Sequence, residues 1–444
     1  MGGKRDDSKA FFAMSNAELS GRIASVTTVA PSAFTFENSL GLCCDGLPLA
    51  DVAARAGTPT YIYSAASIRS AWTRLDAAFA AVPHALHYAL KANSTLDVLR
   101  LLRGLGSGAD ANSGGEIEVA LRAGFIPEDL VFTGVGKTPG ELQRAVSLSL
   151  KAINAESPGE LDRIDAFARA RGTRARVAVR LNPDIEAGGH PHISTGRRIN
   201  KFGVPIELGR ELYRKISKMP GLQPVGVHVH IGSQITDLEP LRQAAVALAG
   251  LVADLVEDGI ALEHLDLGGG LGISYDGSAA PTFEDYAAAV LPVVSPTGLA
   301  TLLEPGRAIV GPSAVLLARV IDIKSYFDGK PFVVLDAGMT ELLRPALYGA
   351  YHRIEPVRPR PGTARTWEIV GPLCESSDIV GKDRVLPPLE VGDLVAVFDA
   401  GAYGSTMSST YNRRPLPCEV MVDDGGWEVI RRRQTIDDMT AMEI

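Results

Sequence analysis

One lysine carries the most distinctive chemistry in this sequence. Lys91 ends an apolar, β-prone run that begins at Ala85, and Asn93 and Ser94 then introduce a helical pattern. An ammonium group at the end of a buried strand is costly unless it is paired, and burial lowers its pKa, which suits an amine that forms a Schiff base. A lysine that merely extends its stem to solvent fits the same spacing. Other residues must therefore decide between these two interpretations.

Polar residues and glycines follow seven further apolar runs of the chain. A structural role explains any one of these groups, but it does not explain all of them together. In chain order they are Asp110 with Ser113–Glu116, Thr133–Gly136, Asn154–Glu156, Arg180 with Asn182, His228 with His230–Gln234, Gly268–Gly270, and Glu304–Arg307.

The elements that must position these residues alternate regularly. Eight βα units in about 220 residues predict an α/β fold, a (β/α)8 TIM-type barrel, whose chemistry lies just past the carboxyl ends of its strands. An open doubly wound sheet is the alternative, but its glycine fingerprint is missing here. The strand-like runs end near Leu90, Ala109, Phe132, Ile153, Leu181, His230, Leu267 and Leu303, with helical patterns such as Ile68–Ala81, Thr95–Arg103, Gly114–Arg122, Ser157–Ala170 and Glu239–Glu257.

A glycine triplet follows the seventh run. Gly268, Gly269 and Gly270 let backbone N–H groups converge on an anion, and Gly306 with Arg307 follows the eighth run. Such a triplet on its own is often just a turn. Because the loops after strands seven and eight are the usual phosphate site of a barrel, we expect a phosphate here.

Glu304 and His230 each have a structural and a chemical interpretation. Glu304 could simply pair with Arg307. Opposite a pyridine nitrogen it would instead keep that nitrogen protonated, by about 5 kcal/mol at roughly 3 Å and an effective dielectric near 20. His230 could be a satisfied core histidine, or it could lie flat against an aromatic cofactor while Ser233 reaches the phosphate.

Four motifs resemble the fold-type III pyridoxal-phosphate decarboxylases. They are His87–Asn93, Gly108–Glu116, His230–Gln234 and Glu304–Arg307. Further motifs favour the branch of this family that acts on meso-2,6-diaminopimelate, and the resemblance extends from about residue 35 to the C-terminus. These further motifs are His190 with Ile193–Gly196, Lys201–Gly203, Asp336–Met339, Arg344–Tyr348, Gly371–Asp378 and Gly401–Gly404.

The resemblance implies pyridoxal 5'-phosphate as the cofactor and gives each candidate a role. Lys91 would hold the cofactor as a Schiff base, Glu304 would contact the ring nitrogen, and His230 would stack on the ring. No metal is implied. The remaining cofactor-binding candidates are Asp110, Ser233, Gly268, Gly269, Gly270, Gly306, Arg307 and Tyr403.

The resemblance also implies a substrate site. Arg344 and Tyr348 would grip the distal carboxylate, since an arginine fork suits a second acidic group. Glu375 would bind the distal ammonium. Cys374 would protonate the carbanion as part of a homodimer whose active sites are shared, although a cysteine is in general more often a buried structural thiol. Arg307 and Tyr403 would lie close enough to contact the substrate as well.

The substrate assignment keeps alternatives. The implied reaction is the decarboxylation of meso-2,6-diaminopimelate to L-lysine and carbon dioxide, the last step of lysine biosynthesis. A site with Arg344 and Glu375 leaves both groups unpaired when the distal amino acid is missing, which disfavours ornithine, lysine and arginine. Related decarboxylases of D-ornithine, carboxynorspermidine or siderophore intermediates remain the main alternative. A non-catalytic regulator is a third class.

The composition changes after Arg307. Strand-like segments separated by turns predict an all-β second domain, which the resemblance extends to the chain before the barrel. We expect a loosely ordered extension over residues 1–33, the β domain over 34–60 and 310–444, and the barrel over 61–309. The strand-like segments are Ala314–Ile323, Pro331–Leu335, Thr366–Val370, Leu394–Phe398, Cys418–Val422 and Trp427–Ile430.

Composition limits the kinds of partner and the cellular compartment that we expect for this chain. The chain has 444 residues and a net charge of −8, without a basic run, which argues against nucleic acid and anionic membrane and favours a small-molecule substrate. Its four cysteines have neither disulfide-framework nor metal-ligand spacing, so a reducing, cytoplasmic location is expected. The apolar run at Phe11 is too short for a signal core or a membrane span.

Overall fold

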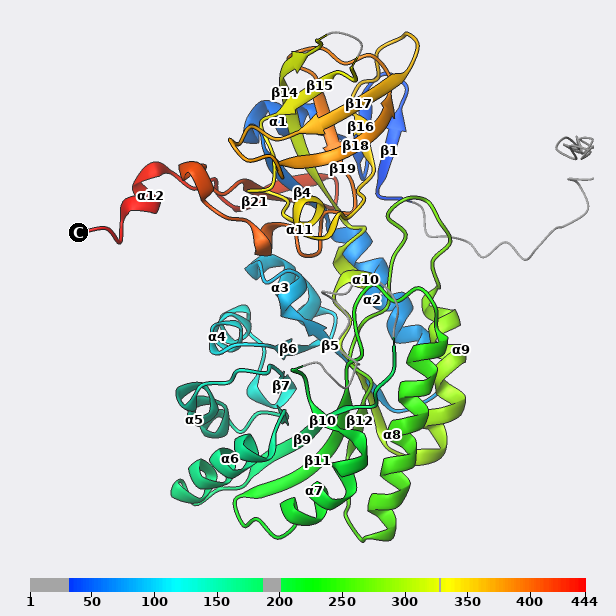
Figure 1. Cartoon of the computed structure of the whole chain (residues 1–444), viewed down its shortest axis with the longest axis vertical. Coiled ribbons are helices and arrows are strands. Elements are labelled where there is room, and N and C mark those ends of the chain that lie inside the picture. The colour runs from blue at the N-terminus through cyan, green and yellow to red at the C-terminus, as the bar shows by residue number, and fades with distance from the viewer. Residues whose placement is uncertain (1–31, 187–200, 327–328) are drawn as a thin grey trace, which may run out of the picture. The chain divides into compact units, whose positions relative to one another are not determined.

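A closed ring of eight parallel strands forms the larger part of the protein, which we describe from a computed structural model covering residues 32–186, 201–326 and 329–444 (Figure 1). The pairings of β8 with β9 and of β13 with β5 close the ring. The predicted barrel is therefore confirmed. Its strands are β5 (His84–Ala89), β6 (Gly108–Ala111), β7 (Leu130–Phe132), β8 (Ala152–Ala155), β9 (Ala175–Asn182), β11 (Leu222–Val229), β12 (His264–Asp266) and β13 (Ala300–Leu303), and β10 (Val204–Pro205) pairs with β9.

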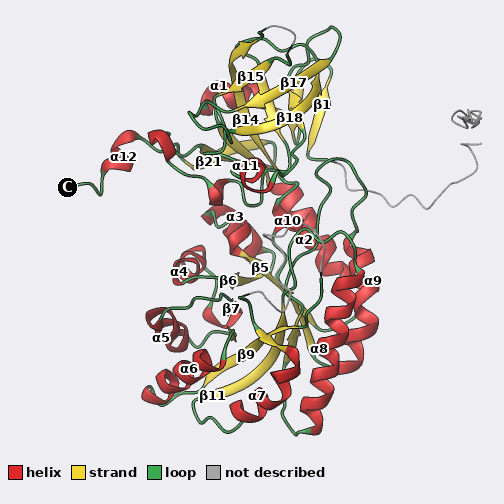
Figure 2. Cartoon of the chain, in the orientation of Figure 1, coloured by secondary structure: helices red, strands yellow, loops and turns green. Residues whose placement is uncertain are grey.

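Helices connect successive strands and surround the ring (Figure 2). Several begin at a hydroxyl cap: the side chains of Ser113, Thr138, Ser157 and Thr282 each accept a hydrogen bond from a backbone N–H in the first helical turn. The caps fix where each helix leaves its loop. The helices are α2 (Ala65–Phe79), α3 (Leu96–Gly104), α4 (Gly114–Ala123), α5 (Pro139–Leu148), α6 (Pro158–Ala170), α7 (Gly209–Ile216), α8 (Glu239–Glu257) and α9 (Phe283–Val294).

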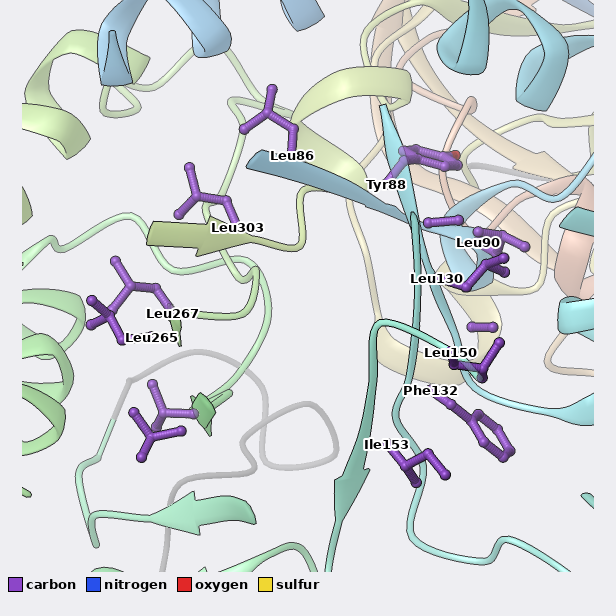
Figure 3. Packing of buried hydrophobic residues seen from close by; sticks show 14 of the residues in the cluster. Leu86, Tyr88, Leu90, Leu130, Phe132, Leu150, Ile153, Leu265, Leu267 and Leu303 are labelled. Atoms are coloured by element: carbon purple, nitrogen blue, oxygen red, sulfur yellow. The ribbon is translucent and has the colours of Figure 1, made fainter. Parts of the chain in front are cut away.

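Side-chain alternation along each strand separates two environments. Leu130 and Phe132 of β7 pack outward into the large core between strands and helices, part of which Figure 3 shows. Val131, between them, belongs to a small separate cluster with Ala152, Val225 and Leu302 from three other strands. Because successive side chains of a strand point to opposite faces, this second cluster fills the lumen of the barrel.

Two histidines also occupy the barrel lumen. His87 and His264 are buried, and a Cβ at Gly108 or Gly226 would collide with their rings. Glycine at these two positions therefore leaves room for an imidazole. Burial lowers the pKa of His87 to about 4 and the pKa of His264 to about 3. Both rings are neutral at physiological pH.

A second sheet contains most of the chain after the barrel. Its path runs β18, β17, β15, β14, β4, β20, β21, and β19 joins β14 to β16. A small sheet of β1 (Phe34–Glu37), β2 (Gly41–Cys44) and β3 (Leu47–Pro48), followed by α1 (Leu49–Ala56), precedes β4 in the chain. The second sheet consists of β4 (Thr60–Ser64), β14 (Ala314–Lys324), β15 (Phe332–Leu335), β16 (Ile354–Pro356), β17 (Arg365–Val370), β18 (Ile379–Leu386), β19 (Leu394–Val397), β20 (Cys418–Asp423) and β21 (Gly426–Arg431).

Three details differ from the expectation. The boundary predicted at residue 60 falls inside β4, which pairs with β14 and β20, so we place the boundary after Ser64 instead. Strands β16 and β18 were not predicted. The second domain is not purely β, since it includes the short helices α11 (Arg344–Tyr348) and α12 (Ile436–Thr440).

The barrel and the second domain contact each other next to Lys91. Lys91 lies in the single turn η1 (Leu90–Ala92) that directly follows β5. The backbone N–H of Tyr403 donates to the carbonyl of Ala92 at 2.8 Å, and the side chain of Asn93 donates to the carbonyl of Gly401 at 3.3 Å. A loop of the second domain thus fixes the turn that presents Lys91. From the barrel, α10 (Arg307–Val310) leads into β14.

Some predictions concern residues that are not described. The extension expected over residues 1–33 lies outside the described residues except for its last two, and so do His190 and the motif Ile193–Gly196. Among the helices that the structure describes, none has both the length and the apolar character needed to span a bilayer.

We expect the two histidines of the barrel lumen to make the fold acid-sensitive. Their folded pKa values lie below the unfolded value of about 6.5, so the unfolded chain binds protons that the folded chain excludes, and stability falls as the pH drops below about 6.5. Each ring should remove roughly 2 kcal/mol of unfolding free energy between pH 7 and 5. Urea unfolding at both pH values measures this. His87→Asn or His264→Asn should each weaken the pH dependence, and an unchanged slope in both variants would contradict the assignment.

Candidate active site

Lys91 is held by two residues of the neighbouring strand and its loop. Its Nζ donates to Asp110 Oδ2 at 2.9 Å and to Asn112 Oδ1 at 3.4 Å. The amide of Asn112 in turn donates to both carboxylate oxygens of Asp110 at 3.1 Å. The lysine is therefore paired, and its amine points toward the carboxyl end of the barrel.

The expected direction of the Lys91 pKa is wrong for the protein without a ligand. Burial lowers the pKa of Lys91, but the carboxylates of Asp110 and Glu304 outweigh burial and raise it above its usual value. The amine is consequently an ammonium ion at neutral pH. It must lose a proton before it can act as a nucleophile.

Glu304 lies at the end of β13 and is almost completely buried. Its Oε1 lies 3.3 Å from His228 Nε2 and accepts a hydrogen bond from Thr133 Oγ1 at 3.4 Å. Burial alone raises the pKa of Glu304, but His228, Lys91 and His230 reverse this and lower it below its usual range. Glu304 therefore keeps its negative charge inside the barrel.

Asp266, at the end of β12, is the neutral neighbour of this charge. Its Oδ1 accepts from the N–H of Gly268 at 2.8 Å. Burial, reinforced by Glu304, raises the pKa of Asp266 well above its usual value. One donor atom each of His228, Asp266 and Glu304 lie within 4.8 Å of one another. Such residue types also hold metals, but the hydrogen bond to Gly268 commits one Asp266 oxygen to the glycine loop.

The glycine loop is a tight cradle. Gly268 and Gly270 have φ values of 66° and 109°, in the region that favours glycine, and a Cβ at Gly270 would lie 2.6 Å from the carbonyl oxygen of Gly232. The N–H of Gly269 donates to His230 Nδ1 at 3.2 Å. Burial, followed by the charge of Lys91, lowers the pKa of His230 well below its usual value. The loop therefore lies against a neutral imidazole.

Arg307 occupies the side of the cradle next to the second domain. Its Nη2 donates to Ser233 Oγ at 3.0 Å and its Nη1 donates to Tyr275 Oη at 2.6 Å. The guanidinium lies 4.8 Å from the ring centroid of Tyr403. Nε of Arg307 is buried and has no hydrogen-bond partner among the described residues. A positive group with unused donors faces the glycine loop, as a phosphate site requires.

Most of the predicted residues meet around two adjoining cavities. The larger, of about 290 Å³, also contacts four residues without a predicted role, Asn112, Thr133, Arg180 and Phe202. Its other lining residues are Lys91, His230, Ser233, Glu304, Arg307, Arg344, Tyr348 and Tyr403. The smaller cavity is lined by Lys91, His230, Ser233, Gly268, Gly269, Gly270, Glu304, Gly306, Arg307 and Tyr403, among others.

Two predicted residues lie elsewhere. Cys374 is exposed, with its Sγ 3.3 Å from the side-chain nitrogen of Asn412. Glu375 lines a separate surface groove. The buried Asp378 accepts from the N–H groups of Leu373 and Met339 and so holds this loop together. One chain thus does not bring Cys374 and Glu375 to its own cavity.

Several site residues had no predicted role. Arg180 is oriented by Glu156 at 2.8 Å and lies 4.7 Å from the ring centroid of Phe202, so its place after a strand was the only signal in the sequence. Asp266 precedes the glycine triplet by two positions and has the same kind of signal. Tyr275 comes from a loop, and nothing in the sequence marks it.

The site fits a phosphate-bearing pyridine cofactor. Buried polar atoms without partners in the described part of the chain include Glu304 Oε2 and Arg307 Nε, which would be available to a ring nitrogen and a phosphate of such a cofactor. A Cβ at Gly268, Gly269 or Gly270 would collide with a backbone carbonyl oxygen, so only glycine fits in this loop. Lys91 lines the same cavity as Glu304 and Arg307.

Comparison with known proteins agrees with this geometry. Residues 65–311 match the family model described as pyridoxal-dependent decarboxylase, pyridoxal binding domain. A protein of Vibrio cholerae named diaminopimelate decarboxylase is 44% identical over 411 residues, which cover 92% of this chain and 98% of that protein.

Solved structures extend the likeness to the whole fold. The diaminopimelate decarboxylase of Helicobacter pylori, complexed with L-lysine, aligns with a TM-score of 0.86 and 42% identity, covering 89% of this chain and 99% of that one. The diaminopimelate decarboxylase of M. jannaschii aligns with a TM-score of 0.88 and 37% identity, covering 93% and 98%.

We expect Asp110→Asn to ease the deprotonation of Lys91. Removing the carboxylate at 2.9 Å lowers the pKa of the amine, so the midpoint of the pH dependence for capture of pyridoxal phosphate should move down by about one pH unit or more. Absorbance near 420 nm follows the capture by the cofactor-free protein. Glu118→Gln, at an exposed carboxylate of α4 that pairs with Arg144, is the control and should leave the midpoint in place. A midpoint that Asp110→Asn also leaves unchanged would refute the assigned role of this pair.

Proposed function

This chain belongs to the pyridoxal-dependent decarboxylase family, and we propose that it decarboxylates meso-2,6-diaminopimelate to L-lysine and carbon dioxide. This is the reaction that the names of its relatives state, and those relatives are matched over nearly their whole length. The cofactor is pyridoxal 5'-phosphate, as in the family. Lysine biosynthesis is the pathway that this product serves.

The observation that carries the proposal is Arg344. This arginine is buried, lines the same cavity as Lys91, and forms no ion pair with a carboxylate among the described residues. A buried guanidinium without a counter-charge is costly, so the site favours a ligand that brings a carboxylate to it. Diaminopimelate has a second carboxylate, at the end far from the reacting carbon. Ornithine and cadaverine do not.

The residues divide the work of the reaction. Pyridoxal phosphate supplies, when bound, the electron sink for the pair of electrons that carbon dioxide leaves behind. Lys91 would anchor the cofactor and exchange a proton with its hydrogen-bond partner Asp110. Glu304, ionised and buried, favours a positive charge on the ring nitrogen. His230 is neutral, so beside the ring it would add no second cation to oppose that charge.

Binding residues set the orientation. Arg307, Ser233 and the N–H groups of the glycine loop hold the phosphate. Arg344 and Tyr348 hold the distal carboxylate. With the phosphate and the distal carboxylate both held, the carboxylate that leaves would be the one at the Lys91 end of the cavity of about 290 Å³, and the bound substrate would displace water from that cavity.

A second copy of the chain would complete the site. Cys374 is exposed and outside the cavity of its own chain, so we place it, with Glu375, over the cavity of a partner in a homodimer. Cys374 would then donate the proton to the carbon that has lost carbon dioxide, and Glu375 would bind the distal ammonium. We further place the enzyme in the cytoplasm, since the four cysteines are free thiols.

Substrate choice is testable with purified protein. Reconstituted with pyridoxal phosphate, the wild type should release carbon dioxide from meso-diaminopimelate at least about 100-fold more efficiently than from L-ornithine, because ornithine leaves Arg344 unpaired. Carbon dioxide release and lysine formation are measured in parallel. Lys91→Ala should abolish both. Release from ornithine but not from diaminopimelate would overturn the substrate assignment.

Sharing of the site between copies is tested by mixing variants. Lys91→Ala and Cys374→Ala should each be nearly inactive alone. After both are unfolded and refolded together in equal amounts, roughly a quarter of wild-type activity should return, since half of the dimers are mixed and each has one intact site. Two Lys91→Ala preparations treated identically are the control. A mixture as inactive as its components would place Cys374 and Lys91 in the same chain's site, and a Cys374→Ala variant that is active alone would place Cys374 outside the reaction.

A further inference from the structure

Arg344 has an unusual partner. Its Nη1 lies 2.6 Å from Nε2 of His352, and both residues are buried. Nε of Arg344 has no hydrogen-bond partner in the part of the chain that the structure describes. A buried arginine is ordinarily oriented by a carboxylate, which also cancels its charge. Here an imidazole takes that place.

The hydrogen bonds of His352 determine its protonation. Its Nδ1 lies 2.8 Å from the backbone carbonyl oxygen of Phe398, which can only accept, so Nδ1 carries the hydrogen. Nε2 is then the unprotonated nitrogen and accepts from Arg344. Burial, followed by the charge of Arg344, lowers the pKa of His352 to about 3. The ring is a neutral acceptor over the whole working pH range.

The other charged groups around this pair do not neutralise it. Arg307 and Arg384 also act on His352, and both are cations that keep the ring unprotonated. Asp399, the residue after Phe398, is partly buried, and burial raises its pKa to about 7 although Arg353 and Arg344 act against this rise. It forms no ion pair with Arg344 within the described residues. The guanidinium keeps its charge for a ligand.

Tyr275 fixes the same arginine from a second side. The guanidinium of Arg344 lies 4.5 Å from the centroid of the Tyr275 ring, and this ring meets the ring of His352 at 5.1 Å and an angle of 70°. The hydroxyl of Tyr275 accepts from Arg307 Nη1 at 2.6 Å. Tyr275 therefore connects the arginine beside the glycine cradle with the arginine at the other end of the cavity.

We propose that His352 is a positioning residue that aims Arg344 at the distal carboxylate of the substrate while leaving the positive charge of Arg344 uncompensated. This inference rests on the proposed function, because it takes the ligand of Arg344 to be that carboxylate. A glutamate in place of His352 would orient the guanidinium equally well, but it would also satisfy its charge and compete with the substrate. A neutral acceptor orients the guanidinium of Arg344 and does not compete with the substrate carboxylate.

A matched pair of variants tests the charge directly. Glutamine and glutamate have the same shape and both can accept from Arg344, but only glutamate brings a charge. His352→Gln should keep the KM for meso-diaminopimelate within about threefold, whereas His352→Glu should raise it roughly 100-fold while kcat changes much less. A structural role alone would affect both variants alike. Tyr275→Phe is a control for the aromatic ring beside Arg344, because it removes the hydroxyl and keeps the ring.

Binding without turnover separates this inference from the proposed function. Wild type should bind L-lysine, which keeps the distal carboxylate, more tightly than cadaverine, which lacks it. His352→Glu should lose this preference and His352→Gln should retain it, as measured by calorimetry with protein whose melting temperature and absorbance near 420 nm match wild type. If the glutamate variant does not fold, His352→Leu, which removes the acceptor, should raise the KM well above that of His352→Gln.

The two hypotheses fail in different ways. If wild type releases carbon dioxide from meso-diaminopimelate but the glutamate and glutamine variants have equal KM values, the role of His352 is refuted and the function stands. If wild type does not act on meso-diaminopimelate, the function is refuted. In that case an unchanged lysine preference in His352→Glu would refute the role of His352 as well.

Discussion

The negative charge of Glu304 is the constraint on which the rest of the site depends. A carboxylate buried at the end of a strand survives only if its surroundings favour ionisation. His228 at 3.3 Å and the nearby ammonium of Lys91 provide that, while Asp266 remains neutral beside it. Two adjacent carboxyl groups thus differ in protonation because of their environments. Of these two carboxyl groups, only the ionised Glu304 would stabilise a cationic ring nitrogen.

Closure of the barrel makes this arrangement possible. Lys91 and Glu304 follow β5 and β13, and Asp110 lies on β6. These three strands are neighbours in space because β13 pairs with β5 and β5 with β6, although Glu304 is more than 200 positions from Lys91 in the sequence. The second domain adds Tyr403, whose N–H donates to Ala92, and Arg344. The cavity is therefore built from a rigid ring and from loops that are fixed to it by backbone hydrogen bonds.

The regular spacing of apolar runs made the fold predictable from the sequence. Contacts between residues far apart in the sequence could not be predicted. The eight strands and the residues after them could be read from apolar runs, but β16 and β18 could not, since β16 is three residues long and contains Pro356, and β18 alternates irregularly. The pKa of Lys91 was predicted in the wrong direction because the sequence does not reveal that Asp110 lies 2.9 Å away. Tyr275 and His352 lie outside the periodic segments, so no pattern marked them.

The two ends of the cavity solve the problem of a buried charge in opposite ways. At the cofactor end, the ammonium of Lys91 is paired with Asp110 and also stabilises the ionised form of Glu304 before any ligand binds. At the far end, Arg344 is oriented by two uncharged groups, the imidazole nitrogen of His352 and the aromatic face of Tyr275. Its positive charge is therefore not neutralised until a ligand binds. Leaving a buried charge unpaired sacrifices stability in the empty protein, and a ligand with a second carboxylate recovers it. Selectivity for such a ligand follows from that difference.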